Sequence, residues 1–204
     1  MAMKMFRHTL WALLVACVAI SCSGEEDTVL PNQQKQLLSF MTSTLRLVSY
    51  EEAIDPSAGQ ENPEFYTEAG NTVYRWITNY YDADRESRPL VEKGSRVNLT
   101  ITLYPFEVRR LTASSVPLYT NDRSLKPVLE KAGLDTQYWS FEPYILTVGE
   151  SSTIKGLALS LEGCREGDIV ELYMTYTMAY GEKWFYALEP ESPLAIHFTI
   201  DLVE

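Results

Sequence analysis

The 204-residue chain is poor in the residue types on which metal sites, disulfide frameworks and nucleic-acid surfaces depend. It has two histidines, His8 and His197, and three cysteines, Cys17, Cys22 and Cys164. That set excludes zinc sites that need several imidazoles, and no disulfide framework can be read from it. Acidic residues outnumber basic ones by 28 to 17, a net charge of −11, and no local basic stripe offsets this excess. We therefore expect no nucleic-acid partner, because an acidic surface repels phosphate backbones.

The motifs of nucleotide-binding and nucleophilic enzymes are also missing. The chain contains no G-x-S-x-G, no Walker loop and no G-x-G-x-x-G. Paired carboxylates such as Glu51/Glu52 and Glu189/Glu191 are present, but in so acidic a chain they indicate a solvated face. His197 is expected to face solvent as well, because strand periodicity places it opposite Ile196 and Phe198. We expect no metal and no cofactor.

Residues 1–22 have the pattern of a bacterial export signal. Lys4 and Arg7 precede an eleven-residue apolar run at 10–20, which is too short to cross a hydrocarbon core of about 30 Å. The run ends in Ala19-Ile20-Ser21-Cys22, which resembles a lipoprotein signal with Cys22 as the lipidated residue. Cys17 is a rival lipidation site, and a plain secretory peptide cut before Cys22 is a further alternative.

Residues 23–31 form an acidic tether behind that cysteine. The acidic run resembles the signal that sends Bacteroidetes lipoproteins to the cell surface. We therefore expect a cell-envelope protein that is anchored to the outer membrane through a lipid on Cys22. The sequence leaves open which side of the membrane it faces.

Hydrophobic periodicity predicts an α+β fold with a mainly antiparallel sheet. Apolar and polar residues alternate at 94–104 and at 194–203, as expected of half-buried strands. Further strands are predicted at 72–81 and 169–177, helices at 32–45, 124–132 and 155–164, and a loop at 55–70.

The order of the segments resembles the FK506-binding-protein (FKBP) family. The strand at 94–104 is followed by Pro143-Tyr144-Ile145-Leu146-Thr147-Val148-Gly149, by Ile154-Lys155-Gly156-Leu157, by a strand from Gly167-Asp168 to Ala179-Tyr180-Gly181, and by a final strand through Phe198. The resemblance covers 91–204 with an insertion at about 105–142, and residues 32–90 add an N-terminal helix and strand, as in Bacteroidetes lipoproteins of this family. It implies a curved antiparallel sheet wrapped around a short helix.

The resemblance also implies a function and a set of site residues. FKBP domains isomerise X-Pro bonds in an apolar aromatic pocket, so the implied partners are proline-containing peptides or exported proteins. Carried over by position, the catalytic residues are Tyr180, Phe198 and Ile154, with the Ile154 amide donating to a substrate carbonyl. The implied substrate-binding residues are Tyr144, Ile101, Leu157, Tyr119 and Trp184.

Three positions depart from the family pattern. Leu157 stands in place of a pocket-floor tryptophan, Ile101 in place of a pocket tyrosine, and Leu118-Tyr119 in place of a Phe-Asp pair. Two functions therefore stay open from the sequence. One is a lipid-anchored prolyl isomerase; the other is a catalytically weak or inactive module of the same fold, with the 105–143 insertion and the 182–189 loop forming a peptide or protein surface. Cys164 is expected to be a buried thiol without a role.

Overall fold

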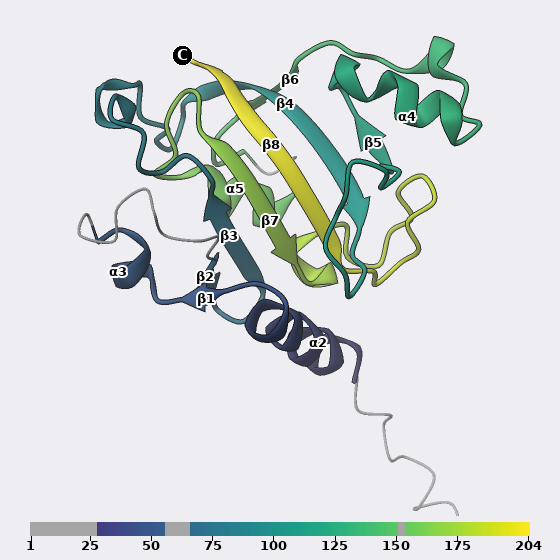
Figure 1. The fold of residues 1–204 in the computed structure, drawn as a ribbon, viewed down its shortest axis with the longest axis horizontal. Helices are drawn as coiled ribbons and strands as arrows, with labels where there is room; N and C mark the ends of the chain where they lie inside the picture. Colours follow the sequence, from purple (N-terminus) through teal and green to yellow (C-terminus); the bar gives the residue numbers. More distant parts are fainter. Residues whose placement is uncertain (1–27, 56–65, 151–153) are drawn as a thin grey trace, which may run out of the picture.

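The structure is a computed structural model that describes residues 28–55, 66–150 and 154–204. The predicted export signal, with Cys17 and Cys22, lies outside these residues. The described strands form one sheet in the order β1-β2-β3-β7-β8-β4-β5, with β6 also paired to β4 (Figure 1). Every pair is antiparallel except β1 with β2. The strands are β1 Leu47–Val48, β2 Tyr66–Ala69, β3 Val73–Ile77, β4 Arg96–Pro105, β5 Tyr119–Thr120, β6 Tyr144–Thr147, β7 Ile169–Met174 and β8 Leu194–Val203.

The helices are short and lie at the margins and faces of this sheet. They are α2 Val29–Ser43, α3 Tyr50–Ala53, α4 Lys126–Lys131 and α5 Lys155–Leu161, with 3-10 turns at Arg85–Ser87, Arg123–Leu125, Thr136–Tyr138 and Tyr176–Met178. In the part of the chain that the structure describes, no helix combines the length and the apolar character that a membrane crossing needs. The predicted α+β architecture with a mostly antiparallel sheet is confirmed, and it is consistent with an FKBP-like fold.

The inner face of the sheet carries the main core, with α5 packed on it. Alternate residues of β4 and β8 point there, including Leu99 and Ile200, and neither has measurable exposure. From α5, Leu157 and Leu161 join the same cluster. Gly156 allows the close approach, because a Cβ at this position would lie 2.6 Å from the sulfur of Met174 on β7.

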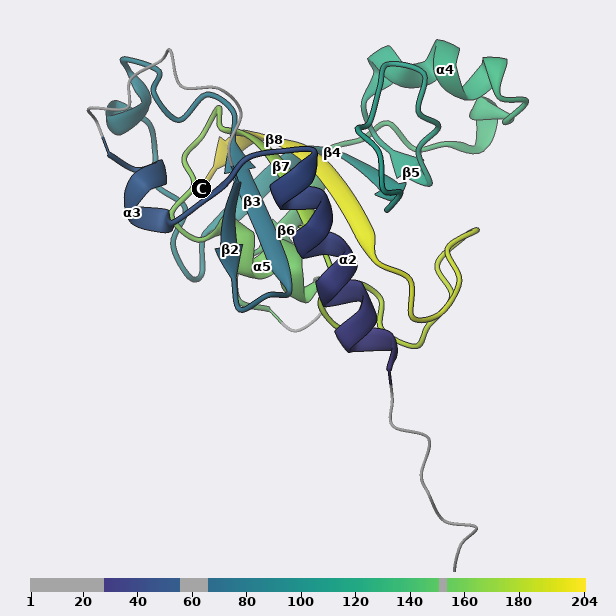
Figure 2. The ribbon, with the colours of Figure 1, turned by 60° about the horizontal axis from the view of Figure 1, so that its bottom comes forward.

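A second apolar layer covers the outer face, where α2 runs across the strands (Figure 2). Leu37, Phe40 and Met41 on one side of α2 are fully buried there. The Phe40 ring lies 5.4 Å from the ring of Tyr173 on β7, in a tilted contact. Alternate residues of the strands therefore contribute to two apolar cores, one on each face of the sheet.

Two of the sequence predictions about this region were wrong. Residues 66–69 were expected in a loop but form β2, which adds to the edge of β3. His197 was expected to face solvent, but Nε2 is buried and lies 3.7 Å from Oε1 of Glu171. It borders a hollow of about 110 Å³ together with Arg110 and Tyr66. Burial lowers the pKa of His197, against a smaller opposite effect of Glu171. The alternation of residues along a strand shows which side chains share a face of the sheet, but it does not show whether another part of the chain packs on that face.

Candidate functional site

The floor of the predicted site is closed by three apolar side chains. Ile101 on β4, Phe198 on β8 and Leu157 on α5 are 1%, 2% and 0% exposed. Ile101 and Phe198 are direct partners across the β4–β8 pair, so the register of the two longest strands places them side by side. All three belong to the core cluster of the inner face. The floor is therefore apolar, buried and free of charge.

Four half-buried residues pack against the core cluster that contains this floor, and we call them the rim. Tyr144 on β6, Ile154 at the start of α5, Tyr119 on β5 and Tyr180 after the 3-10 turn all pack against the same cluster. They come from four separate segments, which the sheet and α5 bring together. The predicted site residues other than Trp184 and Cys22 thus lie in or against one apolar cluster.

The tyrosine hydroxyls of this rim share one electrostatic environment. Burial raises the pKa of Tyr180 strongly, with smaller effects in the same direction from Tyr144, Tyr186 and Tyr119. Burial also raises the pKa of Tyr144 and of Tyr119. The three buried phenols therefore remain protonated hydrogen-bond donors across the physiological pH range. The site can desolvate and hydrogen-bond a neutral group, but these residues supply no acid or base for proton transfer near pH 7.

The loop after Tyr180 places a further ring on the site. Phe185 stacks on Tyr180, with 3.9 Å between the ring centroids and 10° between the planes. The loop folds back here, because Phe185 and Leu188 exchange backbone hydrogen bonds of 3.2 and 2.9 Å. Leu188 is 4% exposed and anchors the loop in the core. Sequence reasoning placed Phe185 only within a partner-binding loop, since no periodic pattern marks a residue in an irregular segment.

Gln33 on α2 ties both ends of the segment that carries Tyr180 and Phe185. Its Oε1 accepts a hydrogen bond from the Tyr176 amide at 2.9 Å, and its Nε2 donates to the Glu191 carbonyl at 2.6 Å. Glu191 in turn donates its amide to the Gly181 carbonyl at 2.8 Å. The N-terminal helix therefore helps to position the site from the opposite face of the sheet. The helix at 32–45 was predicted from the sequence, but no pattern in it indicates this role of Gln33.

Asn121 hydrogen-bonds to β4 at the point where β4 changes from one neighbouring strand to another. β4 pairs with β6 over its first half and with β5 over its second half. Between them, the Asn121 side chain accepts from the Ile101 amide at 2.6 Å and donates to the carbonyls of Leu99 and Glu142 at 2.8 and 3.0 Å. Asn121 is buried and thus substitutes for the missing strand at this point. The sequence carried no signal for this role.

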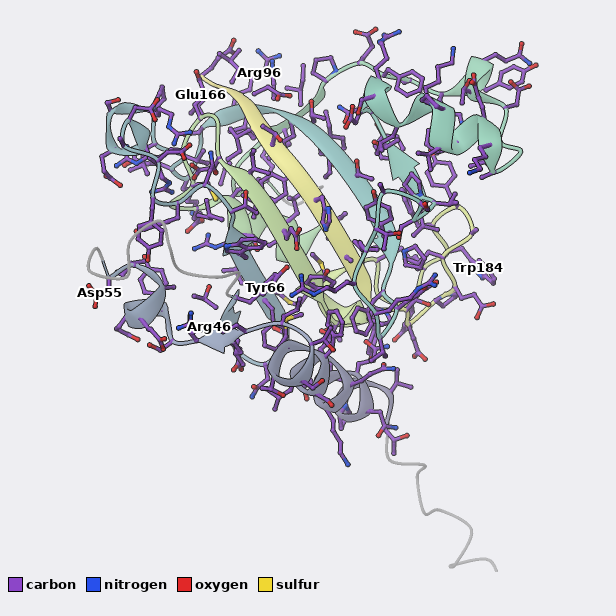
Figure 3. All side chains as sticks on the ribbon, in the orientation of Figure 1. Arg46, Asp55, Tyr66, Arg96, Glu166 and Trp184 are labelled. Atoms are coloured by element: carbon purple, nitrogen blue, oxygen red, sulfur yellow. The ribbon has the colours of Figure 1, made fainter. Side chains whose placement is uncertain are left out.

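Trp184 lies away from the floor and rim, and one rim position carries a different chemical group from the family pattern. Trp184 is 66% exposed and lies on the loop that follows β7 and the 3-10 turn (Figure 3). Tyr119 stands where the resemblance has an aspartate, so a phenol replaces a carboxylate at the rim. The next residue, Thr120, is fully buried, with its hydroxyl 2.8 Å from that of Thr102.

Comparison with known proteins gives one family match. Residues 127–203 match the model of the FKBP-type peptidyl-prolyl cis-trans isomerase family. No curated protein matches the chain. The matched stretch runs from α4 to the end of β8, and it includes six of the eight residues predicted to act in the site, all except Ile101 and Tyr119. Residues 127–203 therefore match an FKBP-type peptidyl-prolyl cis-trans isomerase domain, which implies proline-containing peptides as clients.

Proposed function

We propose that this domain binds proline-containing segments of exported proteins at the Tyr180 site and accelerates rotation about their X-Pro bonds. One observation carries the proposal: the uncharged, closed floor of Ile101, Leu157 and Phe198 belongs to a core cluster against which half-buried tyrosines pack, and the hydroxyls of these tyrosines stay protonated. Rotation faces a barrier of about 18–20 kcal/mol because it breaks amide resonance. The reaction transfers no proton, so it needs no ionised catalyst.

The residues act by binding the twisted amide better than the planar one. In a dry apolar site the polar, resonance-stabilised planar amide loses its water, whereas the twisted amide has less charge separation to lose. The prolyl ring would lie among the half-buried Tyr144, Ile154 and Tyr180, above the closed floor of Phe198 and Leu157. The Tyr180 hydroxyl and the Ile154 amide would donate to carbonyl oxygens of the bound segment and hold it in place.

Tyr180→Phe tests the hydrogen-bonding role without emptying the site. We expect the wild type to accelerate isomerisation of a proline tetrapeptide in a protease-coupled assay, and the variant to lose about tenfold in kcat/KM, the value of one hydrogen bond in a dry site. Phe198→Ala is a poorer test, because removing a buried ring destabilises the fold itself.

Tyr138→Phe serves as the matched control, because Tyr138 is 83% exposed and lies outside the site. It should keep the wild-type kcat/KM. A wild type that gives no acceleration above the uncatalysed rate, at protein concentrations where it is folded, would contradict the proposal.

A binding module without catalysis is the second function, and specific contacts favour it. Phe185 already covers one face of Tyr180, and the floor residues Leu157 and Phe198 are only 0% and 2% exposed. A site closed in this way would bind a segment without twisting its amide. In that case proline peptides would change the tryptophan fluorescence on titration, while the isomerisation rate would stay at the uncatalysed value.

We propose further that the chain is a lipoprotein anchored to the outer membrane through Cys22. The support for this proposal is the signal pattern at 1–22. Each acyl CH₂ buried in the membrane contributes about 0.8 kcal/mol to the free energy of membrane binding. In a bacterial host, wild type and Cys17→Ser should sediment with membranes, whereas Cys22→Ser should lose the anchor and appear in the soluble envelope fraction. Release by Cys17→Ser, with Cys22→Ser still membrane-bound, would move the anchor to Cys17.

A further inference from the structure

A row of aromatic rings continues outward from the candidate site. Phe185, which stacks on Tyr180, also makes an edge contact of 4.6 Å with Tyr186. The Tyr186 ring lies 6.4 Å from the ring of Tyr119 and is nearly parallel to it, at 12°. Tyr119 in turn lies 6.4 Å from Trp139, at 11°. We call Tyr186, Tyr119 and Trp139 the outer row; it joins the loop after the site to the insertion that carries β5.

Tyr186, at one end of the outer row, is held out toward solvent at an energetic cost. Tyr186 is 69% exposed and has a φ of 51°, in the left-handed region that bulky side chains rarely adopt. The backbone pair between Phe185 and Leu188 fixes this turn, and buried Leu188 anchors it. Strain of this kind persists where the surroundings enforce it, and it is typical of binding sites.

The spacing of the outer row matches an extended polypeptide. Successive residues advance by about 3.2–3.4 Å in a strand and by about 3.1 Å in a polyproline II helix. Side chains two positions apart therefore repeat every 6 to 7 Å or so, close to the 6.4 Å between successive rings. Each ring of the row can then meet every second side chain of one extended segment.

The chemistry of the row also restricts its occupant. The three rings are uncharged, and Tyr and Trp provide large contact areas at a small entropy cost on binding. The loop beside Tyr186 carries Glu182, Lys183 and Glu189, in a chain with a net charge of −11. A neutral or basic segment with apolar side chains is therefore favoured over an acidic one.

We infer that the outer row binds the client chain beside its target proline, and that it selects extended segments with apolar side chains at alternate positions. The inference rests on the proposed function, since it takes the Tyr180 site as the place where the proline binds. It assigns the substrate class as unfolded segments with strand-like alternation, a pattern found before a strand has paired. The insertion and the strained loop thus act as one specificity surface.

Nine-residue peptides with one central Ala-Pro bond provide the test. In the two alternating peptides, phenylalanines stand two and four residues from the proline, before it in one peptide and after it in the other. In the two adjacent peptides, they stand two and three residues from the proline, again before it in one and after it in the other. Titration followed by tryptophan fluorescence gives the affinity of each peptide for the full mature protein. We expect the better alternating peptide to bind about tenfold more tightly than its adjacent counterpart, the effect of one well-packed aromatic contact.

Tyr186→Ala should reduce this affinity ratio to about one, and Tyr138→Ala, an 83% exposed tyrosine outside the row, should preserve it. Equal affinity of the wild type for alternating and adjacent peptides would overturn the inference, and so would an unchanged ratio in Tyr186→Ala. Because the readout is affinity, a ratio that persists in a protein without isomerase activity supports the inference while contradicting catalysis. A protein that accelerates isomerisation but binds alternating and adjacent peptides equally well supports the proposed function and contradicts this inference.

Discussion

Asp168→Asn is expected to lower the free energy of unfolding by about 3–5 kcal/mol, the usual cost of breaking a buried ion pair. Asp168 is fully buried, and its two oxygens accept from Nε and Nη2 of Arg85 at 3.0 and 2.7 Å. The Arg165 amide donates to it as well, at 2.8 Å. An asparagine would remove the buried charge partner of Arg85, which is only 3% exposed, and leave it the weaker contact of 3.3 Å with the largely exposed Glu86. It would also set an NH₂ group against donors.

Urea unfolding of the two proteins measures this loss. Glu204→Gln is the matched control. Glu204 Oε2 lies 2.8 Å from Nη1 of Arg96, a distance close to that of the Asp168–Arg85 pair, but both side chains are more than half exposed. Exposed pairs contribute about 0–1 kcal/mol. A loss in Asp168→Asn no larger than in the control would show that the Arg85 pair does not hold the 3-10 turn Arg85–Ser87 against the start of β7.

Asn121→Leu is expected to cost about 2–4 kcal/mol, because it leaves buried backbone groups without their partners at similar side-chain volume. The Ile101 amide loses its acceptor, and the carbonyls of Leu99 and Glu142 lose a donor. The effect reaches the site directly, since Ile101 forms part of its floor. The variant should therefore lose client binding along with stability.

Hydrogen exchange at the Ile101 amide separates this mechanism from general loosening. The amide should be protected in the wild type and should exchange much faster in Asn121→Leu under conditions where both proteins are folded. Asn98→Leu, a half-buried position on the same strand, should change stability by about 0.5 kcal/mol or less. Unchanged protection at Ile101 would contradict the role assigned to Asn121.

The parts of the fold that depend on local pattern could be predicted from the sequence. The alternation at 94–104 and 194–203 corresponds to β4 and β8, and the apolar positions of 32–45 correspond to the buried side of α2. The outer layer could not be predicted in the same way. Period two assigns His197 a face of the sheet, but only the arrangement of α2 and the 106–111 segment makes that face partly buried.

The residues of the candidate site also fall into a group that could be predicted from the sequence and a group that could not. Its floor and rim were located by family resemblance, whose spacing places Ile154, Tyr180 and Phe198 around one helix and sheet. Asn121 and Phe185 were missed, because their roles lie in contacts across the fold: the first with residues 99, 101 and 142, the second with the ring of Tyr180. A single sequence does not encode such partners in any periodic pattern.

Exchange spectroscopy by NMR on a proline tetrapeptide tests the central claim, that an uncharged site accelerates X-Pro rotation. With a catalytic amount of the wild-type protein, we predict cis–trans exchange cross-peaks that the peptide alone does not show on this time scale. The rate should agree within about twofold between pH 6 and pH 8, because burial keeps the rim tyrosines protonated and His197 lies on the other face of the sheet. Absence of exchange at both pH values, or a rate that changes tenfold between them, would contradict the account.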